Sequence, residues 1–342
     1  MNIAVFTRSP CNGDAMKYLA LCAIVKDEDP FLEEWICHHA LIGVEAFIIY
    51  DNGSAYPVRN RLRSFMKGSF LTVVDIPGKA QQMIAYNHCL RNFGRDFRWL
   101  GFLDLDEYAV PKRTHDLRVL LQDYENAAAL GLNWQCFGTN GHKARPQGTQ
   151  LENYVLALDR EDWRKHIKSV VWPQSVSGMW NPHFAVALHD RHTVNERHDP
   201  VVGAFSPFSA ELCQINHYYY RSWQDYHEKM LRGRPDGHTR KIPKKINPPH
   251  GDLPDTSALR FVPALRAMLA REDRASYLAQ CSERFSRKLP LEEILAEVSA
   301  LIAHDRQEEA LVLLSHAAAR EPEQALYDQA RRMLKASLTA AA

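Results

Sequence analysis

Two aspartates separated by one residue follow a hydrophobic stretch in the first third of this sequence. The residues before Asp104 read Trp-Leu-Gly-Phe-Leu, and Asp106 is followed directly by Glu107. The apolar stretch predicts a strand, and alternate residues leaving a strand project to one side, so we expect Asp104 and Asp106 to face the same way. Such carboxylates suit Mg²⁺ or Mn²⁺, which takes one or two of them and then substrate phosphates.

The same Asp-x-Asp pattern is also typical of ordinary strand-ending turns, so its position in the fold decides whether it indicates a metal site. Strand and helix patterns alternate before it, with strands expected over 18–25, 46–50 and 70–76 and helices over 29–42, after 57 and over 83–93. This alternation predicts an α/β fold, Rossmann-like, with a mostly parallel sheet and helices on both faces.

Four carboxylates come just after predicted strand ends: Glu28, Asp51, Asp104 and Asp106. Ligands of open α/β sheets bind in the crevice beyond the carboxyl ends of the strands, so all four are expected to face one crevice. A strand-terminal Asp-x-Asp at that place fits the diphosphate of a nucleotide-sugar donor. The alternative is that each carboxylate is an independent turn or helix-cap residue.

Composition places the chain among ordinary globular proteins. Its 342 residues and net charge of +1 give no reason to expect a nucleic-acid partner. Seven scattered cysteines without a Cys-x-x-Cys pair predict reduced thiols and argue against a zinc or disulfide framework. We find no signal-type leader and no apolar run of membrane-spanning length, so we expect a cytoplasmic protein, with peripheral contact to the inner membrane as a further option.

The composition changes along the chain and predicts four parts. Residues 1–17 form an N-terminal lead-in, and 18–235 form the α/β domain, in which the aromatic-rich stretch 131–220 is expected to build the acceptor side. Residues 236–256 are a basic, Pro-rich loop, interpreted as a lid over the donor, a patch for anionic lipid headgroups or a solvated linker. Residues 257–342 are expected to form an all-α C-terminal extension.

A series of short motifs runs through the α/β domain. They are Lys26-Asp27-Glu28-Asp29, Tyr50-Asp51-Asn52-Gly53-Ser54, Ala85-Tyr86-Asn87, Phe102-Leu103-Asp104-Leu105-Asp106-Glu107-Tyr108 and Asn216-His217-Tyr218. Over 18–235 the series resembles glycosyltransferase family 92, which is of GT-A type and related to the family 2 glycosyltransferases. The resemblance implies a GT-A fold, a nucleotide-sugar donor, Mn²⁺ (or Mg²⁺) as cofactor and inverting transfer.

The resemblance also implies roles for single residues. The metal ligands would be Asp104, Asp106 and His217, with Asp106 favoured for direct ligation and Asp104 reaching the metal or the donor ribose. The residues implied to bind the nucleotide sugar are Glu28, Asp51, Gln82, Asn87, Asp104, Lys168, Arg221, Lys229, Arg232 and Arg234. Arg221 departs from the family pattern, which usually has Lys there. For each residue the alternative is a structural role, such as a polar core contact for Asn87.

An inverting enzyme also needs a base that takes the proton of the acceptor hydroxyl. The candidates beyond the acidic motif are Glu152, Asp190, Glu196 and Asp199, of which we favour Asp190 and Glu152. Departure of UDP develops negative charge, which a metal and one or two of the cations would stabilise.

These observations predict a hexosyltransferase that moves a hexose, with galactose favoured, from a UDP-sugar to a glycan or lipid-linked saccharide such as a bacterial surface polysaccharide. Two alternatives stay open. One is a metal-dependent phosphohydrolase built on Asp104 and Asp106, and the other is a non-catalytic scaffold that acts through the helical tail.

Overall fold

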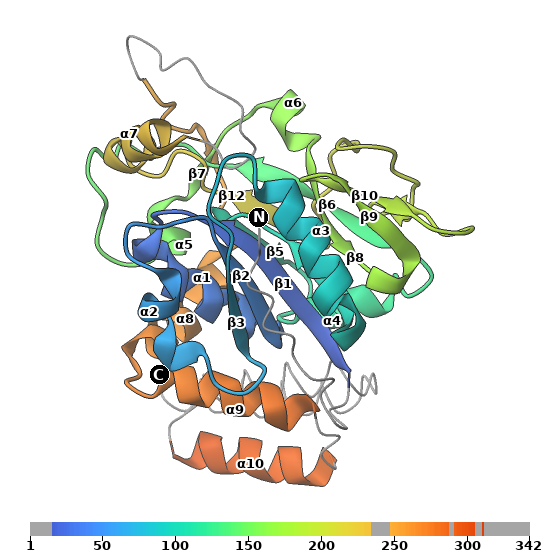
Figure 1. The fold of residues 1–342 in the computed structure, drawn as a ribbon. Helices are drawn as coiled ribbons and strands as arrows, with labels where there is room; N and C mark the ends of the chain where they lie inside the picture. Colours follow the sequence, from blue (N-terminus) through green and yellow to red (C-terminus); the bar gives the residue numbers. More distant parts are fainter. Residues whose placement is uncertain (1–15, 234–246, 287–290, 305–309, 311–342) are drawn as a thin grey trace.

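A central sheet with helices on both faces forms the body of the computed structural model, which describes residues 16–233, 247–286, 291–304 and 310 (Figure 1). The nine strands of this sheet include the ordered path β3-β2-β1-β4-β8-β6-β12-β5, with β11 paired to β6. Almost all of the predicted lead-in and the basic core of the predicted loop, residues 234–246, lie outside the described ranges.

The first half of the chain forms the parallel part of the sheet. In β3-β2-β1-β4, each neighbouring pair is parallel. The elements are β1 (Lys17–Val25), α1 (Asp29–Leu41), β2 (Ala46–Asp51), α2 (Val58–Arg61), a 3-10 turn (Arg63–Phe65), β3 (Leu71–Asp75), α3 (Gln82–Phe93), a second 3-10 turn (Gly94–Asp96) and β4 (Phe97–Phe102). The predicted alternation of strand and helix is confirmed here.

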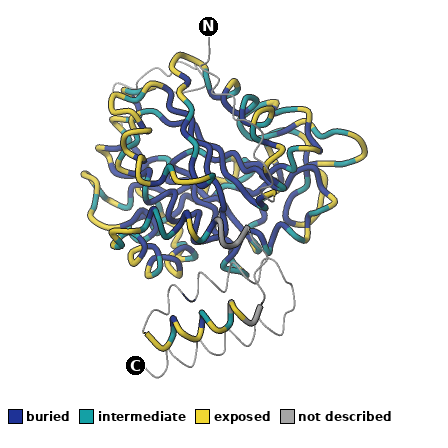
Figure 2. The backbone as a smooth tube through the Cα atoms, turned by 60° about the horizontal axis from the view of Figure 1, so that its bottom comes forward, coloured by how far each residue is buried: buried dark blue, intermediate teal, exposed yellow. Residues whose placement is uncertain are grey.

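Strand β1 shows why helices cover both faces. Leu19 and Leu21 pack in one hydrophobic cluster with Trp35 of α1, whereas Ala20 and Cys22 pack in another with residues of α3. Side chains alternate between the two faces of a strand, so a continuous apolar run fits a strand buried on both sides. Figure 2 shows these central strands as buried tube surrounded by exposed loops.

The second half of the sheet is mixed, but the sheet as a whole is mostly parallel, as expected, with five parallel and three antiparallel strand pairs. Strand β8 is antiparallel to β4 and β6, β12 is parallel to β6, and β5 is antiparallel to β12. The elements are β5 (Glu107–Pro111), α4 (Leu117–Gln122), β6 (Ala129–Cys136), α5 (Gln150–Asn153), β7 (Leu156–Ala157), α6 (Glu161–Arg164), β8 (Ile167–Val171), a 3-10 turn (Pro173–Ser175), β9 (Val176–Asn181), β10 (Phe184–Ala187), β11 (Thr193–Val194), β12 (Cys213–His217), α7 (Trp223–Arg232) and β13 (Leu253–Pro254). Antiparallel neighbours need no long helical crossover, which agrees with the short helices of this half.

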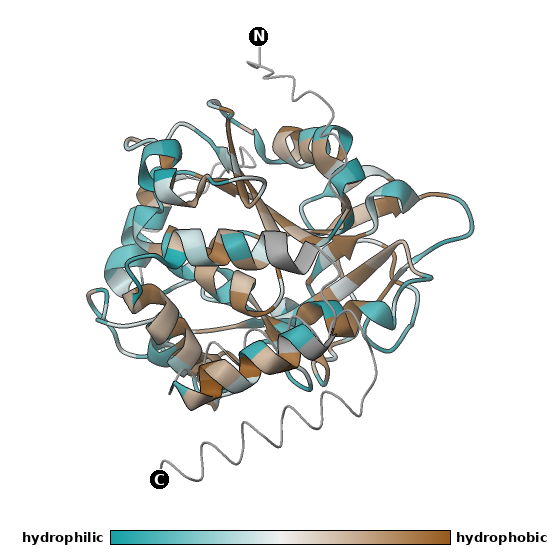
Figure 3. Ribbon diagram, turned by 90° about the horizontal axis from the view of Figure 1, so that it is seen from below, coloured by the Kyte–Doolittle hydropathy of each residue, from teal (hydrophilic) through white to brown (hydrophobic). Residues whose placement is uncertain are grey.

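The C-terminal part is helical where it is described, with a 3-10 turn (Leu259–Phe261), α8 (Val262–Ala270), α9 (Arg274–Ser286) and α10 (Leu291–Ala303). Leu265 and Met268 of α8 are buried in the same cluster as α1, so the start of the predicted extension belongs to the core of the α/β body. Seen from below in Figure 3, hydrophobic colouring follows the central strands, and hydrophilic colouring dominates the surrounding loops. No helix within the described ranges has the length and apolar character needed to span a bilayer.

Candidate active site

The first aspartate of the motif is held by donors from α3 and β8. Asp104 lies just after β4, and its Oδ1 accepts hydrogen bonds from Gln82 Nε2 at 3.0 Å and Tyr86 Oη at 3.1 Å. Its Oδ2 pairs with Lys168 Nζ at 2.9 Å. Gln82 and Tyr86 are four residues apart on α3, so they share one helical face and reach the same carboxylate.

A buried charge network supports this aspartate. Lys168 is fully buried and also pairs at 3.2 Å with Glu107 Oε2, which accepts a hydrogen bond from the Asp104 backbone N–H at 2.9 Å. Burial alone would raise the pKa of Asp104, but Lys168 holds it below its usual range. Burial raises the pKa of Glu107 well above its usual range, although Lys168 opposes this. Asp104 is therefore ionised and matched by a fixed positive charge.

The second aspartate faces α7 and the end of β12. Asp106 Oδ2 forms an ion pair with Lys229 Nζ and lies 3.5 Å from His217 Nε2. Burial alone would raise the pKa of Asp106, but Lys229 and His217 hold it well below its usual range. Burial lowers the pKa of His217 below its usual value despite Asp106, so its imidazole is neutral near pH 7.

A third acidic group joins the same edge of the sheet. Glu28 precedes α1, and its carboxylate pairs with Arg221 at 3.3 Å and with Arg232 of α7 at 3.0 Å. Arg221 also donates to the backbone carbonyl of Leu105, between the two aspartates, at 2.9 Å. Arg221 therefore links Glu28 directly to the acidic motif.

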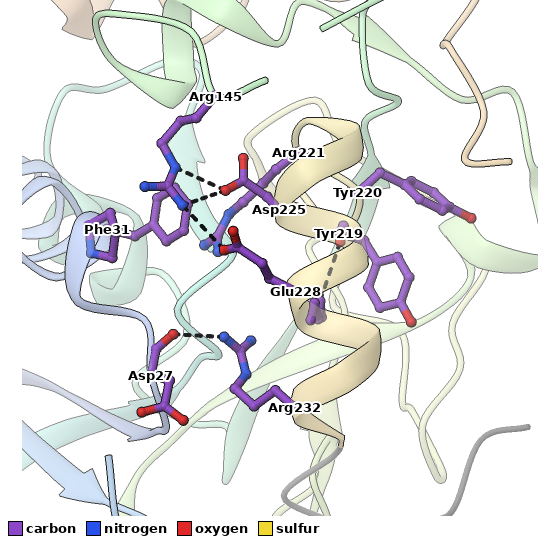
Figure 4. Close-up of a pocket in the computed structure, with 11 residues that line it drawn as sticks. Asp27, Phe31, Arg145, Tyr219, Tyr220, Arg221, Asp225, Glu228 and Arg232 are labelled. Carbon is purple, nitrogen blue, oxygen red and sulfur yellow. Dashed lines mark hydrogen bonds and ion pairs between the residues drawn. The ribbon is translucent and has the colours of Figure 1, made fainter. Parts of the chain in front are cut away.

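Three of the cations that pair with these carboxylates, Arg221, Lys229 and Arg232, line a cleft over which α7 lies (Figure 4). Phe31 packs against the guanidinium of Arg221, and Arg145 donates to Asp225 of α7 at 2.9 Å. Figure 4 shows Arg145 and Phe31 on one side of α7, with Tyr219 and Tyr220 on the other. The volume of this cleft is about 50 Å³, whereas ligand pockets typically have volumes of about 300–1,000 Å³. A ligand of ordinary size would therefore require side chains on α7 to move.

Two residues expected at the donor site have structural partners instead. Asp51 Oδ1 and Oδ2 accept hydrogen bonds from the backbone N–H groups of Ser54 and Val58, at 2.8 Å and 2.9 Å. Asn87 exchanges hydrogen bonds with the backbone N–H and carbonyl of Met179, at 2.9 Å and 3.2 Å, and so ties α3 to β9. These contacts favour the turn interpretation for Asp51 and the polar-core interpretation for Asn87.

The candidate bases do not join the aspartate cluster. Glu152 completes a capping box with Thr149 and forms an ion pair with Arg266, and Asp190 lies exposed in the turn after β10. Of the lesser candidates, Glu196 accepts hydrogen bonds from the backbone N–H groups of residues 211–213, and Asp199 is exposed. Arg234 lies outside the described residues. The identity of the base stays a prediction.

Several residues that contact the candidate site were not predicted. Tyr86 stood in a matched motif, and its spacing of four from Gln82 is a signal that it shares a helical face with that residue. Phe31 and Arg145 gave no comparable signal, because Arg145 lies in a loop whose path depends on the tertiary fold. Gln150 accepts a hydrogen bond from Arg221 at 2.7 Å and donates to Tyr108 at 2.6 Å, and so positions Arg221.

The fit of a divalent metal can be tested on these side chains. Ligands bound to one Mn²⁺ or Mg²⁺ at bond lengths near 2.1 Å lie about 3–3.5 Å apart, and Asp106 Oδ2 and His217 Nε2 are separated by 3.5 Å. Asp104 Oδ1 accepts two hydrogen bonds and its Oδ2 pairs with Lys168, and no cluster of three His, Cys, Asp or Glu with metal-binding geometry occurs among the described residues. Asp106 and His217 are therefore close enough to share a metal that takes its other ligands from phosphate or water, once Lys229 has left Asp106 Oδ2.

Two solved structures show only a weak likeness to this fold. Staphylococcus aureus TarS, residues 1–349, aligns with 95% of this chain and 92% of its own at 11% identity, with a TM-score of 0.36. Glucosyl-3-phosphoglycerate synthase from Mycobacterium tuberculosis aligns with 48% of this chain and 59% of its own at 14% identity, with a TM-score of 0.29.

Sequence relatives are more informative. A glycosyltransferase family 92 protein of Oryza sativa subsp. japonica is 26% identical over 216 residues, which are 62% of this chain and 35% of the relative. A Ricinus communis protein of the same family is 25% identical over 227 residues, or 64% of this chain and 38% of the relative. The chain thus spans little more than a third of these relatives. The family model for glycosyltransferase family 92 matches residues 17–253, well over half of the sequence. This chain therefore belongs to glycosyltransferase family 92.

Proposed function

We propose that this protein is an inverting glycosyltransferase of GT-A type that uses a UDP-sugar and a divalent metal, Mn²⁺ or Mg²⁺. The observation that carries the proposal is the convergence of Asp104, Asp106 and Glu28 with four cations at the carboxyl edge of the sheet: Lys168, Arg221, Lys229 and Arg232. Such a site offers carboxylates to a cation and positive groups to a diphosphate, the pair of requirements of a nucleotide-sugar donor.

Each cluster has a distinct part in this proposal. Asp106 and His217 would hold the metal, which when bound neutralises the pyrophosphate as UDP departs. Asp104, fixed by Gln82, Tyr86 and Lys168, is oriented to accept hydrogen bonds from donor hydroxyl groups. Lys229 and Arg232, on a helix that crosses the cleft, are available to the phosphate oxygens once they leave their present carboxylate partners.

The finer assignments extend the same proposal. A hexose, with galactose favoured, would pass to a glycan or lipid-linked saccharide such as a bacterial surface polysaccharide. A cytoplasmic site with peripheral membrane contact belongs to the proposal too. The membrane contact is supported by the basic composition of 236–256. This support comes from the sequence alone, since the lysines and arginines of that loop lie outside the described residues.

The test is release of UDP from purified protein. UDP-galactose, UDP-glucose and UDP-N-acetylglucosamine are each supplied with Mn²⁺, Mg²⁺ or EDTA, and the expected result is metal-dependent turnover of one donor. Asp106→Asn keeps the side-chain size and should lower that turnover by at least about 100-fold, in the range of lost electrostatic stabilisation. If no UDP-sugar binds with any divalent metal, the proposal is wrong. Release of phosphate from simple phosphomonoesters would support the phosphohydrolase alternative.

A further inference from the structure

A chain of contacting aromatic and imidazole rings leads from the candidate metal ligand to the protein surface. The ring centroids of His217 and Trp134 are 4.3 Å apart, those of Trp134 and His166 4.9 Å, and those of His166 and Phe205 4.6 Å. His183 joins the chain with its ring 5.0 Å from Trp134. We call Trp134, His166, His183 and Phe205 the aromatic wall.

The fold holds the aromatic wall firmly although its elements are distant in sequence. Trp134 is on β6, which pairs with β12 at the register Ile215–Trp134 and with β8 on its other side. Phe205 forms an isolated β-bridge with His166, and the flanking backbone N–H of Ile167 donates to the Ala204 carbonyl at 3.1 Å. The outer end of the wall is nevertheless open, because Phe205 is 57% exposed.

The aromatic wall presents polar atoms as well as ring faces. His183 Nδ1 lies 2.9 Å from the Ile167 carbonyl oxygen, which can only accept, so Nδ1 carries the proton and Nε2 carries a lone pair. Burial lowers the pKa of His183 to about 3, so this imidazole is neutral near pH 7. Trp134 Nε1, by contrast, is buried and not presented to a ligand, and it has no hydrogen-bond partner among the described residues. None of the four residues brings a fixed charge.

This chemistry selects a class of ligand. A phosphate or carboxylate would find no cation on the wall, whereas a pyranose ring has an apolar C–H face for aromatic contact and hydroxyl groups for the imidazole edge. The inner end of the wall, Trp134, contacts His217, which lies against Asp106, so a saccharide that extends inward from Phe205 and His166 would approach the proposed donor site.

We propose that the aromatic wall is the acceptor subsite and binds the sugar ring of a saccharide, with its C–H face on Phe205 and His166 and a hydroxyl group on His183 Nε2. This assignment rests on the proposed glycosyltransferase function, and it places acceptor selection on residues of β6 and the segments around His166, His183 and Phe205.

The test separates acceptor from donor. Saturation-transfer NMR with methyl β-D-galactopyranoside, methyl β-D-glucopyranoside and methyl α-D-mannopyranoside measures saccharide binding without any nucleotide, and titration calorimetry measures UDP binding with Mn²⁺. Phe205→Ala should weaken binding of the favoured glycoside about two- to tenfold, the range for one aromatic contact, and leave UDP affinity unchanged. His183→Gln replaces the partner of the sugar hydroxyl but keeps Phe205 and His166. It should also weaken binding of the favoured glycoside and leave UDP affinity unchanged.

Met16→Ala is the matched control, because Met16 is also 57% exposed but lies before β1, at the opposite end of that strand from Glu28. The assignment is overturned if none of the glycosides binds, if Phe205→Ala and His183→Gln bind them as the wild type does, or if Met16→Ala loses as much affinity. Failure of the proposed function would look different, since the wild type would then bind no UDP-sugar whatever its saccharide binding.

Discussion

Lys229 is expected to compete with a divalent metal for Asp106. Its ammonium pairs with Asp106, lies 3.8 Å from the Tyr219 ring centroid, and is 23% exposed at the side-chain level, whereas Asp106 is 9% exposed. Surface ion pairs contribute roughly 0–1 kcal/mol, and breaking a fully buried one costs about 3–5 kcal/mol. This mostly buried but accessible pair is intermediate, at about 2 kcal/mol, which corresponds to roughly a 30-fold change in an equilibrium constant.

Lys229→Met keeps the aliphatic stem and removes the charge, so it should act on metal and nucleotide in opposite directions. Without nucleotide, Mn²⁺ should bind up to about 30-fold more tightly, because no internal cation has to be displaced. With saturating Mn²⁺, UDP should bind more weakly, because a phosphate partner is lost. Isothermal titration calorimetry measures both affinities directly and needs no turnover.

Lys165→Met is the control for Lys229→Met, because Lys165 pairs with Glu161 one turn away on an exposed helix and should change neither affinity. Unchanged or weaker Mn²⁺ binding in Lys229→Met would refute the reasoning, since it would show that the ammonium and the metal do not share Asp106.

Three further predictions concern the stability of the fold. Arg118→Met should lower the free energy of unfolding by about 3–5 kcal/mol in urea titrations, because Glu45 and Asp116 lose the buried guanidinium that pairs with both. Gly43→Ala should cost more than about 1 kcal/mol in the same assay, since Gly43 has a φ of +100° and a Cβ there would lie 2.1 Å from Asp116 Oδ1. Burial lowers the pKa of His38 from 6.5 to about 4, so only the unfolded chain takes up this proton and stability should fall by about 3 kcal/mol between pH 6.5 and 4. His38→Gln should remove that part of the pH dependence.

The parallel half of the fold was predictable because its signals are local. The apolar run of β1, the Asp29-Pro30 start of α1 and the Gly43 turn lie within 26 residues, and each pattern fits the neighbouring ones. The mixed half depends on pairings between distant segments, such as β12 with β5, about 100 residues apart. Strand direction there is set by tertiary contacts, which hydrophobic patterns of single segments do not specify.

For the candidate site, too, local sequence patterns predicted the positions of residues but not their tertiary contacts. Asp104 and Asp106 were found because a strand end positions them, and matched motifs pointed to Lys168 and Lys229, which the fold brings to them. The same strand-end rule selected Asp51, whose carboxylate is used by nearby backbone N–H groups. A sequence pattern gives the position of a carboxylate but not whether its oxygens remain available, because that depends on the conformation of the turn after it.

The two aspartates differ in the free energy needed to remove the lysine that pairs with each. We therefore expect them to have different roles. Lys168 is fully buried between Asp104 and Glu107, so removing it from Asp104 would leave charge uncompensated in the interior. Lys229 comes from α7, is partly exposed, and can exchange its carboxylate for water or phosphate at a smaller cost. Exchange of cations is therefore expected at Asp106, beside His217, while Asp104 stays fixed and provides geometry. A metal-bound form in which Lys168 had left Asp104 and Lys229 still held Asp106 would contradict this division.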